Sequence, residues 1–328
     1  MSSRKTRPTS RLTAPRDARS TGADDPTLIC AHPTESQGPR PGTRLDEGGQ
    51  IGPYQLVKRI GEGGMGLVFL AAQSKPVTRK VALKLVKAGM DTEEVIRRFE
   101  QERQALAMMD HPGIAKVIDA GATDTGRPFF VMELVEGKTI TQFCDDAGLS
   151  TRQRLSLFID VCHAVQHAHL KGIIHRDLKP SNILVRSHDD RPMPKVIDFG
   201  IAKATEQQHG LHTALTGVHG FVGTPAYASP EQIEMGGTQV DTRSDVYSLG
   251  VILYELLVGS LPFDPDKLEK RGFDQARRAV LGLDPEKPST RVSTLSSKDA
   301  DHWAQRRKAM PAEARRQLRG DLDWIVLR

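Results

Sequence analysis

The stretch IIHRDLKPSNILV, residues 173–185, decides how the chain is interpreted, because it sets a group of polar side chains between two apolar runs. Residues 173–174 and 183–185 are branched and apolar, which predicts a short buried strand on either side. The polar group then lies on a loop held over a core, and such loops commonly carry chemistry. Its members are His175, Arg176, Asp177, Lys179 and Asn182.

A second buried strand is expected directly after this stretch. A polar turn over residues 186–194 leads into KVIDFG, residues 195–200. The strand ends then present Asp177, Asn182 and Asp198 close to a lysine. Oxygen-bearing side chains of this kind suit a hard cation such as magnesium, and the lysine suits a phosphate.

Upstream, a glycine cluster interrupts an alternating pattern. Residues 51–73, IGPYQLVKRIGEGGMGLVFLAAQ, alternate apolar and polar side chains, which predicts two antiparallel strands. The cluster fits GxGxxG, a weak signal alone; because a strand pattern follows instead of a helix, the glycines cap a hairpin. Their backbone amides can lie over a polyphosphate, although an ordinary glycine-rich hairpin has the same pattern.

A lysine and a glutamate are expected to form a buried ion pair. Lys84 lies inside VALKLV, residues 81–86, which has the pattern of a strand. A helix is predicted from residue 91 or 92 to about residue 109, and Glu102 falls on its apolar face. A buried carboxylate without a cation is unfavourable, so Glu102 needs a partner, and Lys84 is the candidate.

The middle of the chain predicts a connector followed by a long helix. The apolar strand RPFFVMELVEG, residues 127–137, ends where polarity returns, which is typical of a link between two lobes. Ser150 or Thr151 then caps a helix that ends at Gly172. Its inward face is expected to hold Leu155, Phe158, Ile159, Cys162 and Val165.

Composition predicts a globular protein in a reducing compartment. The chain has 328 residues, of which 38% are hydrophobic, enough to bury one sizeable core or two joined cores. Its three cysteines give neither a disulfide framework nor a metal-binding spacing. Since no apolar stretch is long enough to span a bilayer, no membrane segment and a cytoplasmic location are expected.

The net charge of +5 comes from one end of the chain. Residues 1–23 hold six basic groups and one acidic group, so the remainder is neutral. This distribution argues against nucleic acid as a partner. The first 50 residues are rich in Ser, Thr, Pro and Gly without apolar periodicity, which predicts a disordered tail.

Taken in order, the motifs resemble those of eukaryotic-type serine/threonine protein kinases of the kind found in bacteria. The resemblance runs from about residue 51 to residue 328 and rests on GEGGMGLV, VALK, Glu102, HRDLKPSN, DFG, GTPAYASPE and SDVYSLG. It implies an α+β, two-lobed protein kinase fold with a small antiparallel-sheet N-lobe and a mostly helical C-lobe. The N-lobe is expected over about 51–132, the hinge over about 133–137 and the C-lobe over 138–328.

The resemblance also implies ATP and Mg²⁺ as cofactors and the γ-phosphate transfer to Ser/Thr hydroxyls of protein substrates. Lys84 then contacts the α- and β-phosphates while paired with Glu102. Asn182 and Asp198 hold magnesium. Asp177 accepts or orients the proton of the substrate hydroxyl, and Lys179, typical of the serine/threonine branch, touches the γ-phosphate.

The rest of the nucleotide site follows from the same resemblance. The glycine loop covers the phosphates, apolar side chains contact the adenine, Met132 is the gatekeeper, and hinge backbone groups bind the adenine. The residues assigned to these roles are Gly61, Glu62, Gly63, Gly64, Met65, Gly66, Val68, Ala82, Met132, Glu133 and Val135.

Regulation is implied at the segment after DFG. Arg176 and Lys203 resemble a cationic pocket for a phosphate on the activation segment, residues 204–222. Thr213 and Thr216 are the candidate autophosphorylation sites, with a homodimer as a possible arrangement for phosphorylation in trans. Thr224 is expected to face the substrate site.

The resemblance is incomplete at the C-terminus. In the family, the glutamate at position Glu231 pairs with an arginine that would fall after Arg328, so the C-lobe is expected to be incomplete and Glu231 unpaired. Residues 285–320 look like an insertion whose second half forms a basic, solvated helix. The alternative function is therefore a nucleotide-binding pseudokinase or scaffold, or an inactive fragment; the presence of Lys84, Asp177 and Asp198 favours the enzyme.

Overall fold

The computed structural model describes residues 47–63, 66–86, 106, 108–188, 191–199, 225–234, 240–263, 282 and 284–328. Several predictions fall outside these residues. They are the tail before residue 47 and the roles of Gly64, Met65, Glu102, Lys203, Thr213, Thr216 and Thr224.

The N-terminal part is a six-stranded antiparallel sheet with the strand order β1-β2-β3-β4-β6-β5. The predicted glycine hairpin is confirmed, because β2 and β3 pair down to Gly63 opposite Gly66. A Cβ atom at Gly66 would lie 2.1 Å from the Leu85 carbonyl oxygen, so this position requires glycine. The strands are β1 (Gln50–Ile51), β2 (Tyr54–Gly63), β3 (Gly66–Gln73), β4 (Arg79–Val86), β5 (Val117–Ala122) and β6 (Pro128–Glu133).

Strand β4 is buried over its last six residues. Its residues from Val81 to Val86 are all buried, so Lys84 lies in the interior at 4% exposure. On one side of the sheet, an apolar cluster includes Tyr54, Phe69 and Leu83. The sheet therefore holds a lysine ammonium where water is scarce, which requires a negative partner.

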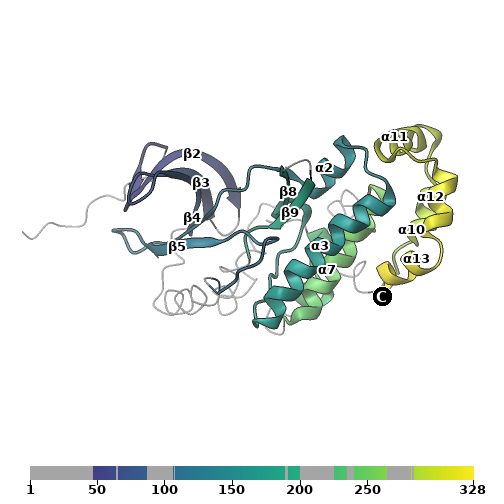
Figure 1. The fold of residues 1–328 in the computed structure, drawn as a ribbon. Helices are drawn as coiled ribbons and strands as arrows, with labels where there is room; N and C mark the ends of the chain where they lie inside the picture. The colour runs from purple at the N-terminus through teal and green to yellow at the C-terminus, as the bar shows by residue number, and fades with distance from the viewer. Residues whose placement is uncertain are drawn as a thin grey trace, which may run out of the picture. The chain divides into compact units, whose positions relative to one another are not determined.

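Helices dominate the second part (Figure 1). Helix α3 (Thr151–Leu170) packs beside α7 (Thr242–Val258). The predicted cap at Ser150 is confirmed, and Ser150 forms a capping box with Gln153. A three-stranded sheet in the order β7-β8-β9 lies between the hinge and these helices. The remaining elements up to α7 are β7 (Lys138–Thr139), α2 (Ile140–Asp146), η1 (Pro180–Asn182), β8 (Ile183–His188), β9 (Arg191–Val196), η2 (Pro225–Tyr227) and α6 (Pro230–Glu234).

Two local predictions are wrong. The inward face of α3 does not include Ile159, which is 51% exposed; the buried face contains Arg154, Leu157 and Val161 instead. A buried arginine has no apolar signature, so the pattern alone misplaces the face. The segment 173–174 is not a strand, because the backbone that follows it is bound by an aspartate side chain and not by a neighbouring strand.

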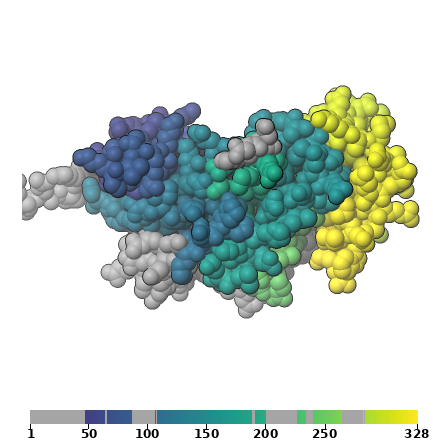
Figure 2. Space-filling model, in the orientation of Figure 1, coloured from purple at the N-terminus to yellow at the C-terminus, as the bar shows by residue number. Residues whose placement is uncertain are grey.

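The C-terminal helices are part of the core and not a solvated insertion. Val292, Trp303, Ala314 and Leu318 are buried in the same cluster as residues of α3 and α7. Figure 2 shows this segment (yellow) in direct contact with the preceding helices. Basic side chains are exposed on the outer face, as expected. The helices are α10 (Pro288–Ser293), α11 (Ser297–Arg307), α12 (Pro311–Leu318) and α13 (Asp321–Leu327).

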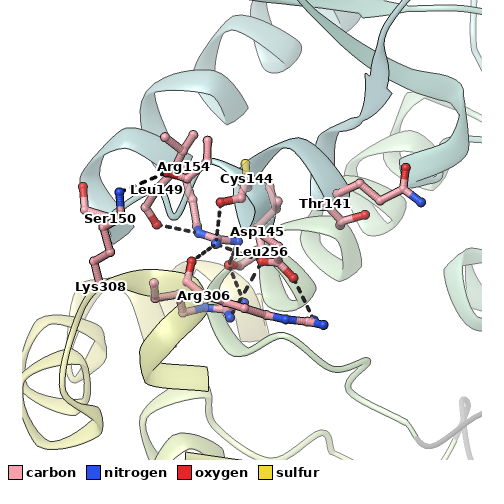
Figure 3. Close-up of polar contacts among 12 residues, drawn as sticks. Thr141, Cys144, Asp145, Leu149, Ser150, Arg154, Leu256, Arg306 and Lys308 are labelled. Atoms are coloured by element: carbon pink, nitrogen blue, oxygen red, sulfur yellow. Dashed lines mark hydrogen bonds and ion pairs between the residues drawn. The ribbon is translucent and has the colours of Figure 1, made fainter. Parts of the chain in front are cut away.

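A shared carboxylate holds α11 against α2 and α3 (Figure 3). Asp145 lies 2.9 Å from Arg154, 3.1 Å from Arg306 and 3.9 Å from Arg307. Arg154 is 1% exposed, and its guanidinium also donates to the carbonyl oxygens of Cys144 and Leu149 at 2.9 Å. Three guanidinium groups therefore depend on one carboxylate.

Within the described ranges, no helix is both long enough and apolar enough to cross a bilayer.

Candidate active site

The loop between α3 and β8 is anchored from below by Asp245 of α7. This aspartate is 1% exposed and accepts hydrogen bonds from the backbone amides of His175 and Arg176, both at 2.8 Å. Its carboxylate also lies 2.7 Å from the His169 ring. Burial pushes the pKa of Asp245 upward, but the bonds from His169 and from the His175 and Arg176 amides outweigh it and hold the pKa below its ordinary value.

Asp245 lies in the SDVYSLG motif, and the sequence alone assigns it no role. The available signal was an aspartate inside an apolar helix, SDVYSLGVILYELLV. A carboxylate that is buried in this way needs several donors, so it marks a place where a loop backbone is fixed.

The backbone is strained at two functional positions. Arg176 has φ 67° and Asp198 has φ 59°, which is the left-handed region that residues other than glycine rarely adopt. Each such residue costs of order 1–3 kcal/mol and persists only where its surroundings enforce it. Arg176 adjoins Asp177, the predicted catalytic aspartate, and Asp198 is itself a predicted magnesium ligand.

His175 connects this loop to the strand that precedes Asp198. Its side chain is fully buried, and its Nδ1 atom accepts a hydrogen bond from the Asp177 amide at 3.3 Å. The other ring nitrogen, Nε2, therefore carries the proton and donates to the Ile197 carbonyl at 3.0 Å. The ring also packs on Phe199 at 4.7 Å. Burial lowers the pKa of His175, so the ring is held neutral.

This buried neutral histidine predicts a pH-dependent stability. The unfolded chain binds a proton at this ring below about pH 6.5 and the folded chain does not, so the free energy of unfolding should fall as the pH drops from 7 to 5. One histidine contributes at most about 1.4 kcal/mol per pH unit. Urea unfolding across this range should show a shallower slope for His175→Gln.

His111 provides the control for that measurement. Burial also lowers the pKa of His111, so it adds to the same slope, and His111→Gln should remove only its own share. The carboxylate of Asp245 does not interfere, because its contribution is lost only below about pH 4. An unchanged slope in His175→Gln would show that this ring is not held neutral.

Two predicted catalytic residues and one predicted magnesium ligand meet on the loop. The Lys179 ammonium lies 2.9 Å from the Asp177 carboxylate. The Asn182 amide nitrogen donates to the Asp177 carbonyl at 2.8 Å and to its carboxylate at 3.3 Å. Asp177 and Lys179 are each 28% exposed, so both are accessible to a substrate.

Lys84 reaches across from the N-terminal sheet to the same place. Its ammonium donates to the Asp198 carboxylate, which follows β9. The expected partner Glu102 lies outside the described residues. Since Lys84 is 4% exposed, this contact supplies the negative charge that its burial requires.

The side chains present suit a magnesium ion. The Asn182 nitrogen is engaged by Asp177, which leaves its carboxamide oxygen as the group available to a cation. The Asp198 carboxylate is a second hard oxygen donor, and magnesium prefers such ligands. The donor set therefore fits the predicted metal.

The predicted adenine contacts lie on neighbouring strands. Ala82 of β4 is directly opposite Met132 of β6, and Val68 of β3 is opposite Lys84. Ala82 and Met132 are buried in one cluster, and Val68 packs against it. The structure also places Gly61, Glu62 and Gly63 at the end of β2, and Glu133 and Val135 where β6 leads into the hinge.

Glu231 is not unpaired, contrary to expectation. Its carboxylate accepts a hydrogen bond from the Ser244 hydroxyl and is half-buried. Burial tends to raise the pKa of Glu231, but the bonds from Ser244, its own backbone and Ser229 hold the pKa below its ordinary value. A neutral donor thus satisfies this carboxylate among the described residues.

Comparison with known proteins agrees with this geometry. The family model of the protein kinase domain matches residues 54–307. The serine/threonine-protein kinase Pkn1 of Myxococcus xanthus is 36% identical over 301 residues, which cover 91% of this chain and 40% of that protein. The serine/threonine-protein kinase PknB of Mycobacterium tuberculosis is 36% identical over 280 residues, covering 84% of this chain and 42% of that protein. The chain thus spans about two fifths of the length of these relatives.

A solved structure shares the fold. The crystal structure of the Mycobacterium tuberculosis PknI kinase domain superposes with a TM-score of 0.55 at 26% identity. The match covers 84% of this chain and 99% of that domain. With the matching family model, the bacterial relatives and the two-lobed arrangement of sheet and helices, the chain belongs to the protein kinase family.

Proposed function

We propose that this chain transfers the γ-phosphate of ATP to serine and threonine hydroxyls of proteins. The observation that carries the proposal is the convergence of Lys179 and Asn182 on Asp177, at 2.8–3.3 Å, with Asp198 held by Lys84. Membership of the protein kinase family and the names of the bacterial relatives support the same reaction.

In the proposed reaction, the substrate hydroxyl oxygen bonds to the γ-phosphorus while the bond from that phosphorus to the bridging oxygen of ADP breaks. Asp177 accepts or orients the hydroxyl proton. Lys179 faces the γ-phosphate oxygens, and Lys84 contacts the α- and β-phosphates. Because charge develops mainly on phosphate oxygens, these fixed cations and the alignment of the two reactants supply most of the acceleration.

Magnesium, when bound, would supply further positive charge against the phosphate oxygens. Asn182 and Asp198 are the residues that would hold it. Asp198 has φ 59°, and strained backbone of this kind clusters at functional sites, which supports the proposed role. The glycine loop, Val68, Ala82, Met132 and the hinge from Glu133 to Val135 would enclose the nucleotide.

Autophosphorylation belongs to the same proposal. Thr213 and Thr216 are the sites we expect, with one copy of the chain acting on another in a transient homodimer. Mixing the active chain with a size-tagged Asp177→Asn copy would label the tagged copy if transfer occurs in trans. Because the reaction consumes ATP and the two cysteines among the described residues, Cys144 and Cys162, are free thiols, we place this domain in the cytoplasm.

The experiment that tests the proposed activity uses γ-labelled ATP, magnesium and a generic basic protein substrate. Acid hydrolysis of the labelled substrate should release phosphoserine and phosphothreonine. Label on tyrosine alone, or none from a folded protein, would contradict the proposal.

A further inference from the structure

A buried ion pair joins the hinge to the strand that leads to Asp198. The Lys195 ammonium of β9 lies 2.7 Å from the Glu133 carboxylate at the end of β6. The Lys195 side chain is 6% exposed, whereas the Glu133 side chain is 25% exposed. A lysine buried to this degree depends on its counterion, so the contact constrains both segments.

The other contacts of this strand end are hydrogen bonds between backbone groups. The Val196 amide and carbonyl bond the backbone of Gly113 and Ala115, at 2.8 and 2.9 Å. The Ile197 amide bonds the Asn182 carbonyl at 2.9 Å. The Glu133 amide also bonds the carbonyl of Lys116, next to Ala115, at 2.9 Å, so the backbone provides an indirect path from Val196 to Glu133. Lys195, three positions before Asp198, adds a direct side-chain contact with Glu133.

We propose that Lys195 is a positioning residue, which sets the spacing between the adenine-binding hinge and the metal-binding Asp198. This inference rests on the proposed function. A nucleotide that touches both places must match their separation, so affinity depends on how well that separation is fixed in advance. A ligand that touches only the hinge does not depend on it.

The geometry around Glu133 supports this role. Its carboxylate also accepts from the Lys116 amide at 3.4 Å and lies 3.7 Å from the Arg186 guanidinium. If the Lys195 charge is removed, Glu133 therefore keeps other donors, and no buried charge is left without a partner. We therefore expect the substitution to disturb the alignment of the hinge with Asp198 while the chain stays folded.

The test compares two ligands on the whole chain by calorimetry. One is adenosine, which reaches the hinge alone; the other is the magnesium complex of a non-hydrolysable ATP analogue, which also reaches Asp198. In Lys195→Met, the affinity for the magnesium–nucleotide complex should fall about tenfold, within the usual range of coupling between two sites. Adenosine affinity should stay within about twofold.

Three further variants complete the test. Lys195→Arg should restore most of the nucleotide affinity, because it keeps the charge. The double variant Glu133→Gln/Lys195→Met should bind the magnesium–nucleotide complex no more weakly than Lys195→Met alone, because the two substitutions remove the same interaction. Lys116→Met is the matched control: it removes an exposed ion pair with Asp110 beside the hinge and should change neither affinity.

The outcomes separate the two hypotheses. The positioning role would be overturned if Lys195→Met lost affinity equally for both ligands, or lost affinity for neither. Binding of the magnesium complex by the unmodified chain without phosphate transfer would contradict the proposed function and leave the comparison of ligands valid. Failure of the unmodified chain to bind either ligand would overturn both.

Discussion

Replacing Asp145 with alanine is expected to lower the free energy of unfolding by about 3–5 kcal/mol, because it leaves buried cations without a counterion. Arg154 and Arg307 are 1% and 3% exposed, and both lie near this carboxylate. Burial, together with the charge of Arg154, already lowers the pKa of Arg307 to about 10. The two guanidinium groups would then repel each other with no compensating charge.

The neighbouring aspartate provides the control for this prediction. Asp146 pairs with Lys138 at 2.6 Å, but both side chains are about 60% exposed, so Asp146→Ala should cost less than about 1 kcal/mol. Chemical unfolding followed by tryptophan fluorescence suits the comparison, since Trp303 lies 5.0 Å from the Arg307 guanidinium. Equal costs for the two substitutions would show that Asp145 does not hold the C-terminal helices.

Replacing Asp177 with asparagine should reduce kcat by about 10²–10⁴-fold, because the side chain can no longer accept the hydroxyl proton. Magnesium–nucleotide binding should change little, since Lys84, Asn182 and Asp198 remain. Steady-state kinetics and calorimetry on the same preparations measure the two quantities.

An exposed carboxylate serves as the matched control for Asp177. Asp160 lies on the solvent side of α3, so Asp160→Asn should leave kcat and nucleotide affinity unchanged. An Asp177→Asn chain that keeps more than about a tenth of kcat would exclude the assigned role.

The parts of the fold that could be predicted are those with a local signal. The alternation around the glycine cluster predicts the hairpin of β2 and β3, and the cap at Ser150 marks the start of α3. The polar loop between apolar runs brings together Asp177, Lys179 and Asn182. In each case the residues that decide the structure are close together in the sequence.

The features that were missed depend on contacts between distant residues. On α3 the pattern wrongly includes Ile159 and leaves out Arg154, which is buried by carbonyl groups of other segments, including Leu256 at 3.4 Å. The role of Asp245 required knowing that α7 lies beneath the catalytic loop. The C-terminal helices carry few apolar residues, yet Trp303 and Leu318 are sufficient to anchor them in the core.

The most direct test of the kinase assignment is autophosphorylation of the purified chain with γ-labelled ATP and magnesium, beside the Asp177→Asn variant. Mass spectrometry would locate the phosphate. The proposed function predicts label on Thr213 or Thr216 that disappears in Asp177→Asn. A folded chain that binds the magnesium–nucleotide complex but labels neither itself nor a protein substrate would contradict the assignment.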